Sequence, residues 1–208
     1  MIEKTLPLID LHRHLDGNLR LNTILELGEK HNISLPASDL EGLRPYIQIT
    51  DPRPGVMAFV EKMILAIGVL ADYDACKRVA YENVEDAYQE GIDYIELRFS
   101  PMFMAEQHGL ALDGVVEAVI EGVSEGQKKF DVSVNLIGII SRTYGPDQGW
   151  NDVTGLQIEI VTRAVQVHRQ EVDPPHPVLG SVGSQLNEQG LLCDPVGRVR
   201  FLRIAVPQ

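Results

Sequence analysis

Residues 8–17 read Leu-Ile-Asp-Leu-His-Arg-His-Leu-Asp-Gly and place His12 and His14 near the end of a predicted first β-strand. Side chains two positions apart lie on the same face of a strand, which rises about 3.3 Å per residue. Both imidazole rings can then reach one zinc ion, which binds histidine nitrogen at roughly 2.0–2.1 Å. A His-x-His pair alone fits better with one core and one surface histidine, because a zinc site usually needs about three or four ligands. The apolar run before the pair and the acid and glycine after it favour the metal site.

Helices and strands are predicted to alternate along the sequence that follows. Apolar residues recur every three or four positions in the helical segments. The segment 33–54 is rich in proline and aspartate and is predicted to be a loop. The predicted helices cover 21–31, a segment that starts near 55, a segment from Asp72 or Asp74 to Gly91, and 112–129, and the further strands cover 92–99 and 132–140.

This order of elements is that of βαβ units, whose crossover connections give a parallel sheet. We therefore predict an α/β fold that is a partial TIM-type (β/α)8 barrel, made of the first three strands and their helices. An open doubly wound sheet is the structural alternative. The barrel places polar residues at the carboxyl ends of strands, where barrel active sites lie: His12, His14, Arg98, Ser100, Ser141 and Arg142. An arginine there must bond to carboxylates or carbonyls because an unpaired buried charge is costly, so we predict a structural role for Arg98.

The sequence pattern changes after residue 142. Segment 143–150 is rich in turn residues, 158–167 fits a strand or a helix, and Asp-Pro-Pro-His-Pro at 173–177 blocks regular structure. Segment 199–206 has the composition of a strand, without a helical partner. We therefore divide the chain into residues 1–142, the N-terminal part of a barrel, and residues 143–208, an irregular tail of uncertain fold.

The composition is ordinary for a soluble globular protein and argues against some classes of partner. The net charge of -12 argues against nucleic acid or an anionic membrane as a partner, since both require a basic surface. No window is long and apolar enough for a transmembrane helix, and the N-terminus lacks the pattern of a signal peptide. Cys76 and Cys193 are isolated cysteines, which suits free thiols in a reducing compartment. We predict a cytoplasmic location.

Two motifs carry a resemblance to a known family. His-x-His-Leu-Asp-Gly at 12–17 and Glu-Leu-Arg-Phe-Ser-Pro at 96–101 resemble the adenosine deaminases of the metal-dependent amidohydrolase superfamily. The resemblance implies that His12 and His14 bind one Zn²⁺ and that His14 and Asp16 contact the nucleoside at its ribose. An aspartate before a glycine is also a common turn residue. Aspartate at this position, where related adenine deaminases carry glutamate, favours a nucleoside over a free base.

The resemblance also implies an activity, hydrolytic deamination of adenosine and deoxyadenosine to inosine and deoxyinosine in purine salvage. Such an enzyme is a hydrolase that acts on a cyclic amidine C–N bond. The helix that carries Phe59 and Met63 resembles the family's apolar gate over the nucleoside, although ordinary core packing is the commoner explanation for any one such residue. Oligomeric state is not predicted.

Several family motifs are absent from this sequence. It contains no His-Ala-Gly-Glu segment, which supplies the third zinc histidine and the proton-shuttling glutamate, and no later Ser-His or Asp-Asp pair. We therefore assign no catalytic residue in this chain and predict that the chain as given is inactive. The alternative to an active deaminase is thus an inactive, truncated fragment, whose tail derives from a shifted reading frame. A different barrel hydrolase that shares only the His-x-His start is disfavoured by the strand at 96–101.

Overall fold

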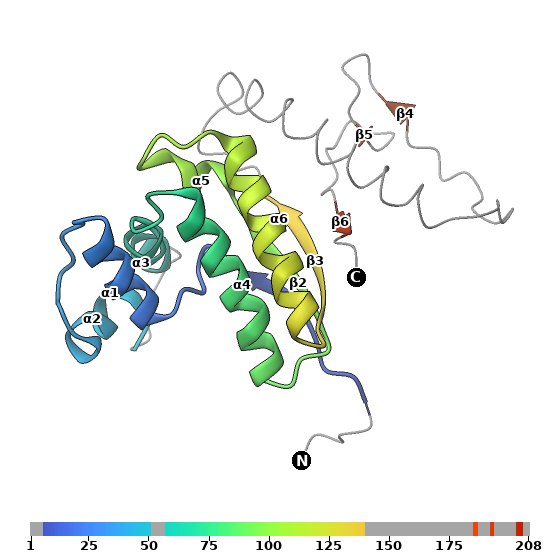
Figure 1. The fold of residues 1–208 in the computed structure, drawn as a ribbon, viewed down its shortest axis with the longest axis horizontal. Helices are drawn as coiled ribbons and strands as arrows, with labels where there is room; N and C mark the ends of the chain where they lie inside the picture. Colours follow the sequence, from blue (N-terminus) through green and yellow to red (C-terminus); the bar gives the residue numbers. More distant parts are fainter. Residues whose placement is uncertain (1–5, 51–56, 140–184, 187–191, 194–202, 206–208) are drawn as a thin grey trace, which may run out of the picture.

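A computed structural model describes residues 6–50 and 57–139 together with the short segments 185–186, 192–193 and 203–205. Helices cover one face of a β-sheet in this part of the chain (Figure 1). The helices are α1 Leu21–Lys30, α2 Leu40–Ile47, α3 Met57–Ile67, α4 Tyr73–Gln89, α5 Pro101–Glu106 and α6 Leu112–Lys129. The strands are β1 Ile9–His14, β2 Tyr94–Phe99, β3 Ser133–Gly138, β4 Gln185–Leu186, β5 Leu192–Cys193 and β6 Arg203–Ala205.

The main sheet has the strand order β1-β2-β3-β6. β1 pairs with β2 and β2 pairs with β3 in parallel, as predicted from the βαβ order. This arrangement confirms the predicted α/β class and is that of a partial TIM-type barrel. β6 is antiparallel to β3 and lies within the strand predicted over 199–206. The predictions for Ser141 and Arg142 and for 143–150, 158–167 and 173–177 lie outside the described residues.

The core lies between the sheet and the pair of helices α4 and α6, which run side by side (Figure 1). Ile95 and Leu97 on β2 and Leu136 on β3 are fully buried. Glycines let the two helices approach closely, because a β-carbon at Gly122 would lie 2.2 Å from the carbonyl oxygen of Lys77. Close helix contact thus depends on the absence of a side chain on α6.

Two helices differ from the sequence prediction. α2 lies inside the segment predicted as a loop, even though Pro45 falls within it. The helix forms because the Asp39 side chain accepts a hydrogen bond from Gly42 N–H and caps its start, while Leu43 is fully buried. α5 was not predicted, and it begins where Ser100 caps a helix whose first residue is Pro101.

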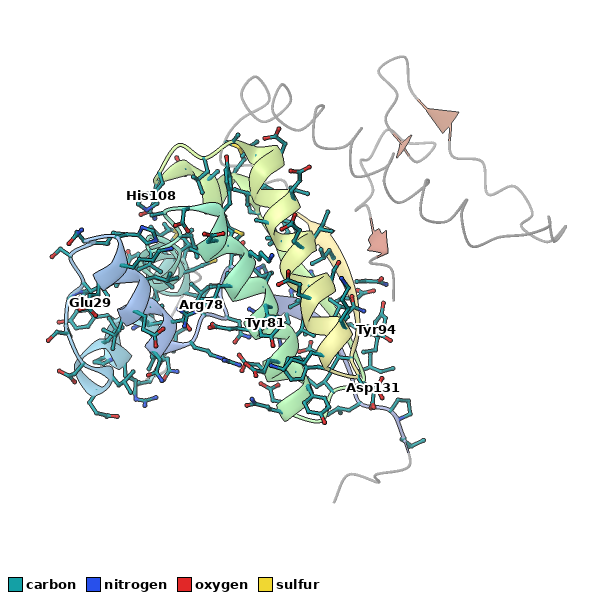
Figure 2. The ribbon with its side chains drawn as sticks, viewed as in Figure 1. Glu29, Arg78, Tyr81, Tyr94, His108 and Asp131 are labelled. Atoms are coloured by element: carbon teal, nitrogen blue, oxygen red, sulfur yellow. The ribbon has the colours of Figure 1, made fainter. Side chains whose placement is uncertain are left out.

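The end of α4 was predicted correctly at Gly91. This glycine has a φ of 74°, in the left-handed region that closes helices. The N–H of Ile92 then bonds back to the carbonyl of Ala87 and leads the chain into β2. Arg78 lies on α4, on the side toward α1 (Figure 2). It forms ion pairs with Glu26 on α1 and with Glu82 on α4 itself. These ion pairs connect α1 to α4.

The other face of the parallel sheet is partly polar. By the pairing register, Tyr94, Glu96 and Arg98 share this face with Asn135 on β3. The Tyr94 hydroxyl accepts a hydrogen bond from Asn135 at 2.6 Å. Ile9 on β1 is exposed. In a closed barrel this face lines the interior. Within the described part of the chain, none of the helices is long and apolar enough to cross a membrane.

Candidate metal site

β1 carries an irregularity just before the histidine pair. Asp10 pairs with Ile95 and Arg13 pairs with Leu97, so β1 advances by three residues over the length in which β2 advances by two. This is the signature of a β-bulge, in which two residues face one residue of the neighbouring strand. Here Leu11 and His12 together face Glu96. The bulge was not predicted from the sequence.

The two histidine rings lie close together, and by the register His14 lies on the partly polar face of the sheet that also carries Arg98. Their ring centroids are 5.6 Å apart and their planes are inclined by 39°. Two imidazoles on one tetrahedral zinc, each at a Zn–N distance of roughly 2.0–2.1 Å, would have centroids about 5 Å apart. His12 is exposed and the His14 side chain is 35% exposed, so the rings are accessible to a metal ion. The observed pair therefore fits zinc.

Asp16 is buried directly behind the pair. Its side chain is 2% exposed, and Oδ1 lies 3.3 Å from Nδ1 of His14. Oδ2 accepts a hydrogen bond of 2.9 Å from the N–H of Ser100, the residue after β2. The carboxylate thus connects the ends of β1 and β2. A carboxylate bonded to Nδ1 directs Nε2 of the same ring toward a metal, which is the usual arrangement around histidine ligands.

Asp16→Ala is expected to lower the free energy of unfolding by about 1–3 kcal/mol, because the N–H of Ser100 then lacks an acceptor at a buried site. Urea unfolding of the purified chain measures this change. Asp16→Asn is the matched control, since its side-chain oxygen can still accept that hydrogen bond, and it should cost less. An Asp16→Ala chain as stable as the parent would show that the contact between the strand ends does not contribute.

The two residues of the predicted gate on α3 have different surroundings. Met63 is buried and belongs to the core. Phe59 is 39% exposed, and a β-carbon built on Gly17 would lie 3.5 Å from its Cζ atom. The Phe59 ring therefore lies over the turn that follows β1. Of the two residues, Phe59 lies beside the turn after the histidines and Met63 is part of the core.

Other candidate ligands are not brought to the pair. Among residues 6–50 and 57–139, no group of three or more His, Cys, Asp and Glu residues could hold a metal ion. Cys76 is fully buried on α4, where desolvation raises the pKa of its thiol to about 12. It is a packed thiol and is unsuited to bind a metal as thiolate. The described site supplies two histidine nitrogens.

Arg98 has the kind of partner that the sequence predicted. Its Nη2 donates a hydrogen bond of 3.0 Å to the backbone carbonyl of Leu11, within the bulge. Asp10 was missed as a site residue, although Oδ1 of Asp10 accepts a hydrogen bond of 3.0 Å from the N–H of His12. An acid two residues before a histidine gave no recognisable sequence signal.

The parallel strands and the histidines at the carboxyl end of β1 define part of an α/β barrel of the amidohydrolase class. The adenosine deaminase family model matches residues 7–172, and the chain belongs to that family. The match extends beyond residue 142, where we expected the resemblance to end.

The related proteins are longer than this chain. The adenosine deaminase of Vibrio parahaemolyticus is 50% identical over 194 residues, which cover 92% of this chain and 58% of that protein. The chain spans about half the length of the curated relatives it matches.

Solved structures show the same fold. Arabidopsis ADAL in complex with IMP is 27% identical with a TM-score of 0.56, over 79% of this chain and 47% of that protein. An amidohydrolase from Burkholderia ambifaria with bound Zn is 20% identical with a TM-score of 0.57, over 82% of this chain and 42% of that protein. The second likeness concerns the fold alone.

Proposed function

We propose that this chain provides the first zinc ligands and part of the nucleoside site of a hydrolase that converts adenosine and deoxyadenosine to inosine and deoxyinosine. The pair of rings 5.6 Å apart at the carboxyl end of β1 is the observation that carries the proposal. Membership of the adenosine deaminase family supports it. A zinc ion held by His12 and His14 would supply the activation of water for attack on C6 of the purine.

The chain's own residues have separate tasks in this proposal. His12 and His14 hold the metal through ring nitrogens. Asp16 keeps the His14 ring in place and, because a carboxylate oxygen can accept more than one hydrogen bond, Oδ1 can also accept one from a ribose hydroxyl. Phe59 covers the turn after β1 and would exclude water from one side of a bound base. The ADAL–IMP complex supports a purine as the ligand class.

Location, partners and domain limits follow as parts of the same proposal. A chain with a net charge of -12 that acts on a free nucleoside requires no nucleic acid or membrane surface, so we place it in the cytoplasm. We propose residues 1–142 as the barrel part and residues 143–208 as a tail. The family match to residue 172 limits a shifted reading frame to the part of the tail beyond it. Alignment of the gene in its three frames tests this hypothesis: restoration of His-Ala-Gly-Glu in another frame is expected, and its absence from all frames would refute the hypothesis.

His12→Ala is expected to weaken zinc binding by at least about tenfold, since a site of two ligands would retain one. Competition with a chromophoric chelator measures zinc affinity directly on the full 208-residue chain. His108→Ala is the control, because His108 is an exposed histidine whose ring bonds the carbonyl of Gly68 instead. Equal affinity of the parent and His12→Ala chains would contradict the zinc assignment.

A further inference from the structure

The peptide group between Leu11 and His12 loses its regular partners in the sheet, because these two residues together face Glu96. Its N–H and its carbonyl therefore need other hydrogen-bond partners. Two side chains supply them from opposite sides. Asp10 accepts from the N–H of His12 at 3.0 Å, and Arg98 donates to the carbonyl of Leu11 at 3.0 Å.

The Asp10 side chain has a second partner, and the backbone of Arg98 is anchored in β2. Oδ2 of Asp10 accepts a hydrogen bond of 3.0 Å from Nε of Arg13, whose guanidinium also pairs with Glu90 just after α4. Arg98 is part of β2, at the position that pairs with His14. The peptide is thus tied to the helix layer through Asp10 and to the neighbouring strand through Arg98.

The bulge determines which face of the sheet carries the histidines. By the register, Ile9 pairs with Tyr94 and His14 pairs with Arg98, and Tyr94 and Arg98 share a face. Residues five positions apart lie on opposite faces of an uninterrupted strand. The extra residue therefore allows Ile9 and His14 to share the face that in a closed barrel would be the interior.

We propose that Asp10 and Arg98 are positioning residues that clamp the Leu11–His12 peptide and thereby orient His12 and His14 toward one metal ion. The predicted effect on zinc affinity rests on the proposed function. The predicted effect on the orientation of the two rings does not, because it concerns the metal-free chain as well. A guanidinium on the face of the ligand pair repels a cation. Electrostatics alone would therefore favour an uncharged residue at position 98.

Orientation of the histidines and charge repulsion predict opposite changes in zinc affinity when Arg98 is replaced, so the direction of the change distinguishes them. Arg98→Met removes the donor and the charge together. If Arg98 orients the pair, zinc affinity should fall about tenfold or more, as is common when a residue that supports a ligand is removed. If Arg98 only contributes charge, affinity should rise. Unchanged or tighter zinc binding by a folded Arg98→Met chain overturns the proposal.

Conservative variants make the test independent of folding defects. Arg98→Lys keeps a donor and a charge, and Asp10→Asn keeps an acceptor for the His12 N–H, so both should retain most of the zinc affinity that Arg98→Met and Asp10→Ala lose. Arg44→Met is the control, since the partners of Arg44 among the described residues are Glu41 and Gln48, within and next to its own helix. Loss of affinity in the conservative variants equal to that in Arg98→Met would also refute the clamp.

A second readout needs no metal. In proton NMR of the metal-free chain, nuclear Overhauser contacts between the His12 and His14 rings should be present in the parent and weakened in Arg98→Met and Asp10→Ala. If the parent chain does not bind zinc, the proposed function fails while these contacts still decide the clamp. Ring contacts that persist in both disruptive variants would overturn it.

Discussion

Purified and supplied with zinc, the 208-residue chain is expected to convert adenosine to inosine at no more than a trace rate. The sequence contains no His-Ala-Gly-Glu segment, and the described residues bring together only a pair of histidines as ligands. Loss of general acid–base help alone lowers a rate by about 10²- to 10⁴-fold. Incomplete coordination of the metal should lower it further.

Inosine formation is measured by absorbance or chromatography at equal protein and zinc concentrations. The Vibrio parahaemolyticus adenosine deaminase serves as the active reference, because it is 50% identical over most of this chain. Turnover within tenfold of that reference would contradict the expectation. It would mean that residues outside the described part provide the missing ligands and proton shuttle.

Gly122→Val is expected to destabilise the chain more than Asp16→Ala does. A β-carbon at position 122 lies 2.2 Å from the Lys77 carbonyl oxygen and 2.9 Å from the β-carbon of Ala80, both on α4. Backbone atoms of a packed helix cannot move aside cheaply, so α6 would have to separate from α4. Overpacking typically costs about 1–3 kcal/mol and sometimes more, and we expect a loss of about 3 kcal/mol or more.

Urea unfolding gives the loss as a decrease in the transition midpoint. Gly138→Ala is the matched control, because a β-carbon there meets nothing within 4 Å and its φ is outside the left-handed region. Gly122→Ala should fall between the two, since alanine favours helix by about 1 kcal/mol over glycine but still meets Lys77. A Gly122→Val chain of parental stability would show that α4 and α6 do not approach as closely as described.

The long elements could be predicted because their hydrophobic periods are strong. α1, α6, the end of α4 at Gly91 and the two later parallel strands are all present close to the predicted limits. α2 and α5 were missed, since each is short and its formation depends on a cap and on tertiary burial rather than on period. Pro45 in particular argued for a loop, and the burial of Leu43 outweighs it.

Part of the candidate site could also be predicted from a local sequence pattern. The spacing of His12 and His14 indicated that their rings would be adjacent, and they are. The bulge that places His14 on the same face as Arg98 depends on the register between β1 and β2. No local pattern of residues specifies this register. The need of Arg98 for a carbonyl partner could be argued from charge burial, but its identity, Leu11, depends on that register.

The two edges of the main sheet are unequal. Residues 203–205 pair antiparallel with β3, whereas β1 has no neighbouring strand on its outer side among the described segments. A further strand that closed a barrel could add at β1 directly, but at β3 it would first have to displace this three-residue segment. A separately supplied polypeptide that completed the barrel would therefore add a strand directly beside β1. Beside β3, its strand would have to replace residues 203–205. Removal of residues 203–205 should replace the exchange at β3 by simple addition and leave the addition at β1 unaffected.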